Sequence, residues 1–150
     1  MYRFKNNYKN YLRYNKHKRA CALCAPEDFT IIEQTEYAVV VVNNYPYDIW
    51  EQSVVLEHLM VLPLEHKANL SELSPATQND IMALLAAYET KGYNIYARSV
   101  NNKHRSVAHH QHTHLIKIAN DYARASLYIE KPYLLKMFGR HTKSKKTAQN

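Results

Sequence analysis

The pattern of apolar and polar residues divides most of the chain into short strands separated by polar loops. Five segments combine β-branched and apolar side chains between polar neighbours and are predicted strands: residues 29–33, 37–42, 53–62, 94–100 and 109–118. Turn-forming and polar residues predict loops at residues 43–48 and 101–105, and Pro63 ends the third strand. Weaker patterns predict a strand at residues 127–129 and a short packed segment at residues 132–138.

One main helix is predicted between two of these strands. Ser74 suits the N-cap and Pro75 suits the first helical position. Apolar residues then recur at helical spacing as far as Tyr88, and Gly92 suits the end, so the helix covers about residues 75–91. Residues 70–73 form a shorter helical turn. The layout is an α+β fold: a mostly antiparallel sheet with one main helix and a short helix.

Charge is distributed unevenly along the chain, with basic ends and an acidic middle. Residues 1–19 contain seven basic and no acidic residues, residues 131–150 contain six basic and no acidic residues, and the net charge of the whole chain is +7. We expect four regions: a basic N-terminal arm (1–19), partly helical; a domain (20–120); an extension packed on the domain (121–139); and a disordered basic tail (140–150).

The basic ends permit two interpretations. Their tyrosines and basic side chains could stack on bases and bind the backbone of a nucleic acid. Alternatively, they are solvated tails that aid solubility, which is the interpretation we favour.

Nothing in the pattern indicates a membrane segment. No apolar run follows Met1, and the longest aliphatic stretch, residues 38–42, is far too short to cross a bilayer. We therefore expect a cytoplasmic protein with no membrane partner. In that compartment the Cys21-x-x-Cys24 pair favours metal or redox chemistry over a structural disulfide. No βαβ pattern surrounds the pair, which argues against a thioredoxin-like role, whereas two thiolates are half of a tetrahedral zinc site.

Three histidines alternate in His110-Gln111-His112-Thr113-His114, directly before an apolar segment. Side chains at every second position share one face of a strand and not of a helix, so the imidazoles are expected in a row, about 6.5–7 Å apart. A histidine-rich solvated loop that binds metal by chance is the alternative. Strict alternation followed by Leu115 and Ile116 favours the strand.

This motif resembles the signature of the histidine triad (HIT) family of nucleotide hydrolases and nucleotidyl transferases, His-x-His-x-His followed by two apolar residues. Leu115 and Ile116 fit that signature, whereas Gln111 and Thr113 stand where the family has apolar residues. The resemblance implies that His112 is the nucleophile that forms a nucleotidyl-histidine intermediate, and that His114 stabilises the phosphate-bearing state. It also implies a nucleotide substrate and a homodimer with the main helix at its interface.

Some histidine triad proteins, and the related galactose-1-phosphate uridylyltransferases, have an N-terminal Cys-x-x-Cys that belongs to a zinc site. The resemblance implies that this site is completed by His66, which follows Pro63, and by the first triad histidine. Zinc would then be a structural cofactor with four protein ligands: Cys21, Cys24, His66 and His110.

The resemblance also indicates residues around the substrate. Asn43 matches a position that binds ribose hydroxyls, Ser106 matches a serine that donates to phosphate, and His58 matches a histidine that many members share. Arg98 stands where the family has Asn, and it could clamp a phosphate. Two further cations in the next loop, Lys103 and Arg105, could neutralise a leaving polyphosphate or could be surface charges.

Three functions remain open at this point. The favoured one is a hydrolase or nucleotidyl transferase acting at the α-phosphate of a nucleoside phosphoramidate, a dinucleoside polyphosphate or a similar nucleotide conjugate. The second is a non-catalytic, zinc-stabilised module that binds nucleotides or nucleic acid through the basic arms. The third is a purely structural metal protein.

Overall fold

The computed structural model describes residues 1–138 except 2, 4, 17–20, 123–124 and 131–132. Its elements follow one another along the chain in this order: α1 (Lys5–Lys16), η1 (Pro26–Asp28), β1 (Ile31–Gln34), β2 (Ala38–Val42), β3 (Ile49–Trp50), β4 (Ser53–Pro63), η2 (Leu70–Glu72), α2 (Pro75–Thr90), β5 (Asn94–Tyr96), β6 (Thr113–Tyr122), β7 (Ala125–Glu130) and β8 (Tyr133–Phe138).

The main sheet has the strand order β1-β2-β4-β6-β5, with β3 paired to β4, and all of its pairs are antiparallel. Strand β4 lies at its centre and pairs with β6 from Val61 opposite Thr113 to Ser53 opposite Tyr122. Strands β7 and β8 form a separate two-stranded sheet. The predicted α+β fold with a mostly antiparallel sheet is confirmed.

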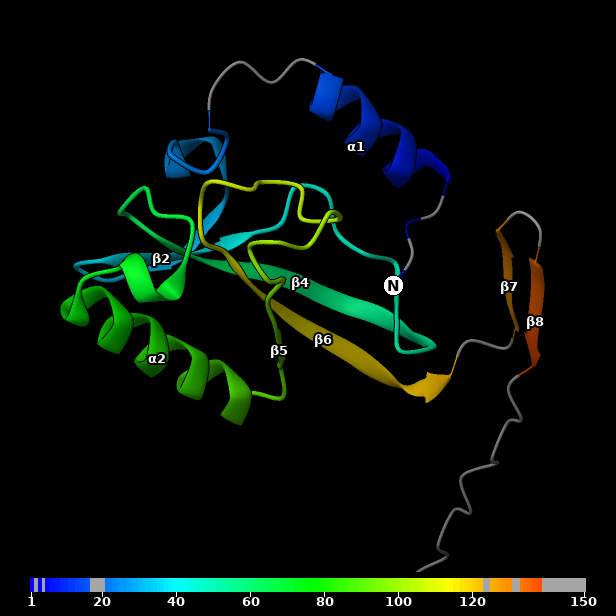
Figure 1. Cartoon of the computed structure of the whole chain (residues 1–150). Coiled ribbons are helices and arrows are strands. Elements are labelled where there is room, and N and C mark those ends of the chain that lie inside the picture. Colours follow the sequence, from blue (N-terminus) through cyan, green and yellow to red (C-terminus); the bar gives the residue numbers. More distant parts are fainter. Residues whose placement is uncertain (2, 4, 17–20, 123–124, 131–132, 139–150) are drawn as a thin grey trace, which may run out of the picture.

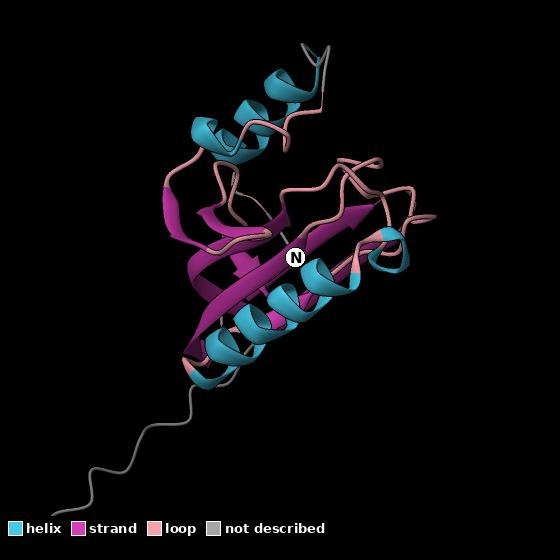
Figure 2. Cartoon of the chain, turned by 90° about the vertical axis from the view of Figure 1, so that its left-hand side faces the viewer, coloured by secondary structure: helices cyan, strands magenta, loops and turns pink. Residues whose placement is uncertain are grey.

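The two faces of the sheet are covered by different parts of the chain. Helix α2 covers one face, and α1 lies beyond the other (Figures 1 and 2). Alternate residues of β2 point to opposite faces, so Val40 packs towards α2 while Val39 packs beside Leu23 on the other side. Residues 38–41 are therefore all buried, as an apolar strand covered on both faces should be.

Helix α2 begins and ends where the sequence predicts. The Ser74 hydroxyl accepts a hydrogen bond from the Thr77 backbone N–H at 3.2 Å, and Pro75 follows it as the first helical residue. Gly92 has a φ of 84°, which closes the helix with hydrogen bonds from Gly92 N to Glu89 O and from Tyr93 N to Tyr88 O.

Strand β6 begins later than predicted, at Thr113 and not at residue 109. The last pair between β4 and β6 joins Val61 to Thr113, and the backbone N–H of Gln111 donates to the carbonyl of Lys67, beyond the end of β4. His110 and His112 therefore lie in the segment that leads into the strand, and only His114 lies on it.

Strand β5 is also shorter than the predicted strand at residues 94–100. It lies at the edge and pairs only with β6, and its last residue, Tyr96, pairs with His114. Because β6 begins at Thr113, one residue before His114, the residues after Ala97 have no partner in that strand. Strand β3 was not predicted at all; it forms a tight hairpin with β4 through Glu51 and Gln52, whose φ values are 46° and 66°.

The structure describes the two ends of the chain in part. Helix α1 covers and extends the expected helical part of the arm, while residues 17–19 lie outside the described residues. Strand β6 continues to Tyr122, beyond the predicted domain boundary at residue 120. The predicted tail, residues 140–150, lies outside the described residues. Within the described part of the chain, no helix is long and apolar enough to cross a membrane.

Candidate functional site

His110 is fully buried where β4 ends. Its Nε2 lies 3.0 Å from the carbonyl oxygen of Pro63. A carbonyl oxygen can only accept, so Nε2 holds the proton and Nδ1 presents its lone pair. Burial, the largest effect, lowers the pKa of His110, which keeps this imidazole neutral and able to bind a metal ion.

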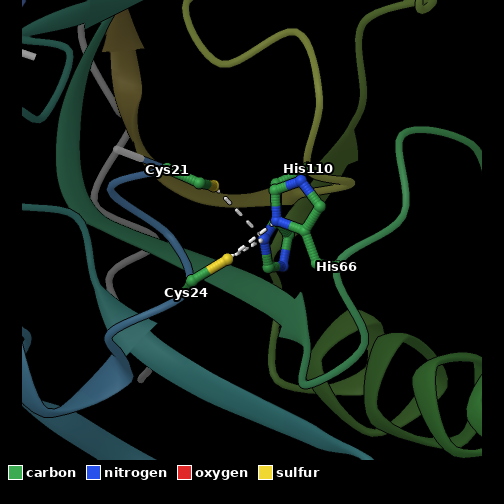
Figure 3. A group of neighbouring side chains, drawn as sticks. All are labelled: Cys21, Cys24, His66 and His110. Carbon is green, nitrogen blue, oxygen red and sulfur yellow. Dashed lines mark hydrogen bonds between the residues drawn. The ribbon is translucent and has the colours of Figure 1, made fainter. Parts of the chain in front are cut away.

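The lone pair of His110 faces two cysteines and a second histidine (Figure 3). Its Nδ1 lies 3.5 Å from the Sγ of both Cys21 and Cys24, and Cys24 Sγ lies 2.8 Å from Nδ1 of His66. All four ligand atoms lie within 4.8 Å of one another. The structure thus brings together the four residues that the sequence indicated as metal ligands.

This group fits a tetrahedral metal ion. Zinc bonds of about 2.3 Å to sulfur and about 2.0 Å to nitrogen place neighbouring ligand atoms roughly 3.5 Å apart. The two distances from His110 match that separation, and the shorter one between Cys24 and His66 has to lengthen. Burial, followed by the hydrogen bond and charge of Cys21, raises the pKa of the Cys24 thiol. A shared cation opposes that effect by favouring the thiolates.

A buried arginine holds the segment between the metal group and the sheet. Arg105 Nη2 donates to the carbonyls of Ala68 and His110 at 2.8 and 3.1 Å, and to Gln111 Oε1 at 3.1 Å. Burial lowers its pKa. Arg105 is thus neither a surface charge nor a contact for a leaving polyphosphate. The contact with Arg105 also explains why Gln111 is polar, where the resemblance to the family implies an apolar residue: its side chain accepts a hydrogen bond from the buried guanidinium.

His112 is oriented by the main chain of the previous triad residue. Its Nδ1 lies 3.0 Å from the carbonyl oxygen of His110, so Nδ1 donates and the lone pair of the neutral ring is on Nε2. The ring is buried and lies 5.2 Å from that of His114, nearly perpendicular to it.

Two further histidines form a hydrogen-bonded chain. The backbone N–H of Tyr47 donates to His58 Nδ1 at 3.0 Å, so His58 carries its proton on Nε2. That Nε2 lies 2.9 Å from His114 Nδ1 and donates to it. His114 must then carry its own proton on Nε2, where it is a hydrogen-bond donor.

Both histidines of this chain are held neutral. Burial, with a smaller contribution from the charge of Arg3, lowers the pKa of His58 to about 3. Burial also lowers the pKa of His114 well below its ordinary value, helped by the neighbouring His58 and His112 and by the cations Arg98 and Arg3. A proton on His58 Nδ1 would face the N–H of Tyr47, which is a second reason why His58 stays neutral.

The other predicted substrate residues lie at different depths. Asn43 is buried at the end of β2; its Oδ1 accepts from the Tyr45 N–H at 2.8 Å, and its Nδ2 lies 3.1 Å from His58 Nε2. Arg98 is half-buried and its Nε donates to the Tyr96 hydroxyl at 3.2 Å. Ser106 is exposed in the segment between β5 and β6. The structure thus brings Asn43 to His58, while the roles of all three residues stay predictions.

The aromatic side chains around His114 were not predicted. Tyr47 and Tyr96 have ring centroids 5.8 and 5.9 Å from that of His114, and Trp50 packs against both tyrosines. Thirteen tyrosines in the chain were the only sequence signal, and a count does not indicate positions. The rings shield the histidines from water on the face opposite α2.

No protein-family model and no curated protein sequence matches the chain. Among solved structures, a HIT family hydrolase from Clostridium thermocellum is similar with a TM-score of 0.52 and 19% identity, over 69% of this chain and 94% of that one. A hypothetical protein from Leishmania major has a TM-score of 0.52 and 22% identity, over 84% and 85% of the two chains. A histidine triad protein from Clostridium difficile has a TM-score of 0.50 and 14% identity, over 70% and 95%.

The chain has the histidine triad fold. This confirms the fold that the alternating histidines implied. At these identities the similarity concerns the fold, and the chemistry has to be argued from the residues of this chain.

The buried neutral state of His58 predicts how stability depends on pH. The unfolded histidine takes up a proton below its ordinary pKa of 6.5, whereas the folded one stays neutral down to about 3. His58 therefore contributes fully above pH 6.5 and stabilises less as the pH falls. Between pH 7 and pH 5 the free energy of unfolding should decrease by about 2 kcal/mol through this residue. Urea denaturation at several pH values measures the decrease.

A His58→Asn variant should be less stable at pH 7 and should lose less stability on going to pH 5. His104→Asn, which removes an exposed histidine, is the matched control and should keep the wild-type pH dependence. Equal losses in wild type and His58→Asn would contradict the prediction.

Proposed function

We propose that this protein is a nucleotide hydrolase or nucleotidyl transferase that acts at the α-phosphate through a nucleotidyl-histidine intermediate on His112. The supporting observation is the set of proton positions. The hydrogen bond from His112 Nδ1 to the carbonyl of His110 leaves a lone pair on Nε2, and the chain from His58 leaves a donor on His114 Nε2. A nucleophile and a donor for a phosphate oxygen thus lie on neighbouring rings.

The reaction has two steps. The lone pair of His112 Nε2 attacks the α-phosphorus, an N–P bond forms, and the bond to the leaving group breaks with its electron pair going to that group. Water then attacks the same phosphorus and releases one proton to the solvent, while the N–P bond breaks and its electron pair returns to Nε2. His114 Nε2–H donates to the phosphate oxygen on which negative charge increases.

The remaining residues bind the rest of the nucleotide in this proposal. Asn43 receives the ribose hydroxyls, since its side chain already lies beside His58. Ser106 and Arg98 lie in the segment between β5 and β6. In this proposal they contact the phosphates, Ser106 as a hydroxyl donor and Arg98 as a cation. The His110 carbonyl keeps the nucleophile oriented throughout.

Brief mixing with adenosine 5′-phosphoramidate or diadenosine polyphosphates should give wild-type protein a nucleotide-sized increase in intact mass. Quenching at alkaline pH preserves the phosphorus–nitrogen bond, and mass spectrometry measures the adduct. His112→Ala should give no adduct and should lose at least about 100-fold in turnover, since it removes the attacking atom.

His109→Ala is the matched control, because it removes an exposed histidine three positions away and should form the adduct normally. Absence of adduct and product with every nucleotide would overturn the proposal. Strongly salt-dependent nucleic-acid binding that His112→Ala leaves intact would instead support a binding module.

We also propose that Cys21, Cys24, His66 and His110 hold a structural zinc ion. Two thiolates and two imidazoles are a natural donor set for zinc, and the hydrogen bond from His110 Nε2 to Pro63 aims the second nitrogen at the thiols. Four protein ligands leave no open position, so the ion would fasten the segment after α1 to the entrance of β6 and would not activate water.

Purified protein should contain about one zinc ion per chain, and Cys24→Ser or His66→Asn should lower this content because each removes a ligand. Both variants and treatment with a strong chelator should also lower the free energy of unfolding. Elemental analysis and urea denaturation measure the two effects. His109→Asn should retain the metal, and a wild-type protein free of zinc, or variants that keep it, would refute the assignment.

A homodimer with α2 at its interface is the partner that we propose for this chain. The outer side of α2 has an apolar patch: Met82 is 65% exposed, Ala83 and Ala86 are exposed, and Leu85 is half-buried. An exposed apolar helix face of this kind is typical of an interaction surface.

Met82→Glu should convert the dimer to a monomer, because a carboxylate would be buried without a partner in the interface. Light scattering after size-exclusion chromatography measures the mass. Leu56→Glu places the same charge on an exposed apolar residue of β4 and should remain dimeric. A monomeric wild type, or a dimeric Met82→Glu, would exclude this interface.

A further inference from the structure

The N-terminal arm is attached to the loop between β2 and β3, which leads into the candidate site. Arg3 Nε donates to the Tyr45 carbonyl at 2.9 Å, and Asn7 Nδ2 donates to Asp48 Oδ1 at 2.8 Å. The ring of Tyr11 meets that of Tyr45 edge to face, with centroids 6.1 Å apart. Helix α1 accordingly lies on the side of the sheet away from α2 (Figures 1 and 2). The described part of the arm is therefore docked, and the favoured interpretation of a solvated tail does not hold for it.

This docking places the guanidinium of Arg3 beside the aromatic wall of the site. Its Cζ lies 4.4 Å from the ring centroids of both Tyr11 and Tyr47. The Tyr47 ring in turn lies 4.7 Å from His58 and 5.8 Å from His114. One tyrosine ring thus separates the charge of Arg3 from the triad.

Arg98 has an equivalent position on a second ring. Its Cζ lies 6.0 Å from the centroid of Tyr96, whose ring stacks on His114 at 5.9 Å. Its other donors reach the carbonyl of His104 and the sulfur of Met1, the latter at 3.0 Å. Arg3 of the N-terminal arm and Arg98 of the segment after β5 therefore place two cations on two rings that flank His114.

Neither cation is neutralised by the described part of the chain. Among the described residues, neither Arg3 nor Arg98 forms an ion pair with a carboxylate; the pair that does form joins Lys117 to Glu57. Both arginines help to lower the pKa of Tyr47's neighbour His114, so their charges act on the same site. Among the described residues, Arg3 uses only Nε in a hydrogen bond, which leaves its two Nη groups as donors.

We propose that Arg3 and Arg98 together bind the phosphate chain of an anionic leaving group, which makes the N-terminal arm part of the substrate site. The inference rests on the proposed function. When His112 Nε2 bonds to the α-phosphorus, the broken P–O bond leaves its electron pair on the oxygen of the departing phosphate chain. Two guanidinium groups stabilise that charge. An amine leaving group, as in a phosphoramidate, departs uncharged after protonation and gains nothing from them.

The test compares two substrates that share the attacked phosphate and differ in the leaving group. These are diadenosine tetraphosphate, which loses a nucleoside triphosphate, and adenosine 5′-phosphoramidate, which loses ammonia. Arg3→Ala should lower kcat/KM for the tetraphosphate by about tenfold or more, and the effect on the phosphoramidate should be several-fold smaller. Arg3→Lys, which retains charge without the planar fork, should lie between Arg3→Ala and wild type.

Arg13→Ala is the matched control, because it removes an exposed arginine from α1 and should retain the wild-type ratio of the two kcat/KM values. Titration calorimetry of diadenosine tetraphosphate against His112→Ala, with and without Arg3→Ala, measures binding without turnover. A weaker affinity in the double variant than in His112→Ala supports the inference, even if the wild type proves inactive. Inactivity of the wild type would overturn only the proposed function.

Turnover of the phosphoramidate by the wild type would support the proposed function. With that activity present, three outcomes for Arg3→Ala would overturn the inference. The first is an equal loss for both substrates in Arg3→Ala. The second is no loss for either. The third is a gain for both, which would mean that the arm obstructs the site instead of serving it.

Discussion

The hydrogen bond between the His110 imidazole and the Pro63 carbonyl is the contact on which the rest of the site depends. Because the carbonyl can only accept, Nε2 holds the proton and Nδ1 is aimed at the two thiols. The same bond holds the His110 main chain at the end of β4, where its carbonyl accepts from His112 and Arg105. The metal group and the proposed nucleophile are therefore oriented by one residue, through its side chain and its carbonyl respectively.

The histidines in the interior of the site form a polar but uncharged chain. Buried polar atoms are tolerated when each has a partner, and the chain from Tyr47 N–H through His58 to His114 satisfies this condition with one arrangement of protons. Burial and the surrounding aromatic rings keep these imidazoles neutral. Attack on a phosphate requires a neutral histidine beside a histidine that donates a hydrogen bond. Burial of the imidazoles therefore favours the proposed chemistry, and the same burial lowers the stability of the protein at acidic pH.

Charge enters at the edge of the site. Arg3 and Arg98 lie on the rings of Tyr47 and Tyr96, outside the buried histidines, and a third arginine, Arg105, is occupied in holding the backbone. An anionic substrate would thus meet fixed cations at the rim and neutral donors further in. Tyr47 and Tyr96 contribute no charge, but their rings set the distance between the two arginines and the buried histidines.

Local patterns in the sequence determined the elements whose signals lie within a few residues. The Ser74-Pro75 start and the Gly92 end of α2 and the alternating faces of β2 follow from local geometry. The prediction that strand geometry sets all three triad imidazoles in one row is wrong, because β6 begins at Thr113 and only His114 lies on it. The fold and the four ligands Cys21, Cys24, His66 and His110 were implied by the resemblance of these motifs to a known family.

The tertiary structure alone decided the start of β6, the burial of Arg105, the aromatic wall and the position of the arm. The strand begins at Thr113 because its pairing with β4 ends at Val61. Arg105 binds the carbonyls of Ala68 and His110, which lie far apart in the sequence and meet only in the folded chain. Arg3 reaches Tyr47 across more than forty positions of the sequence. Such contacts depend on the packing of whole elements, and no local pattern of residues encodes them.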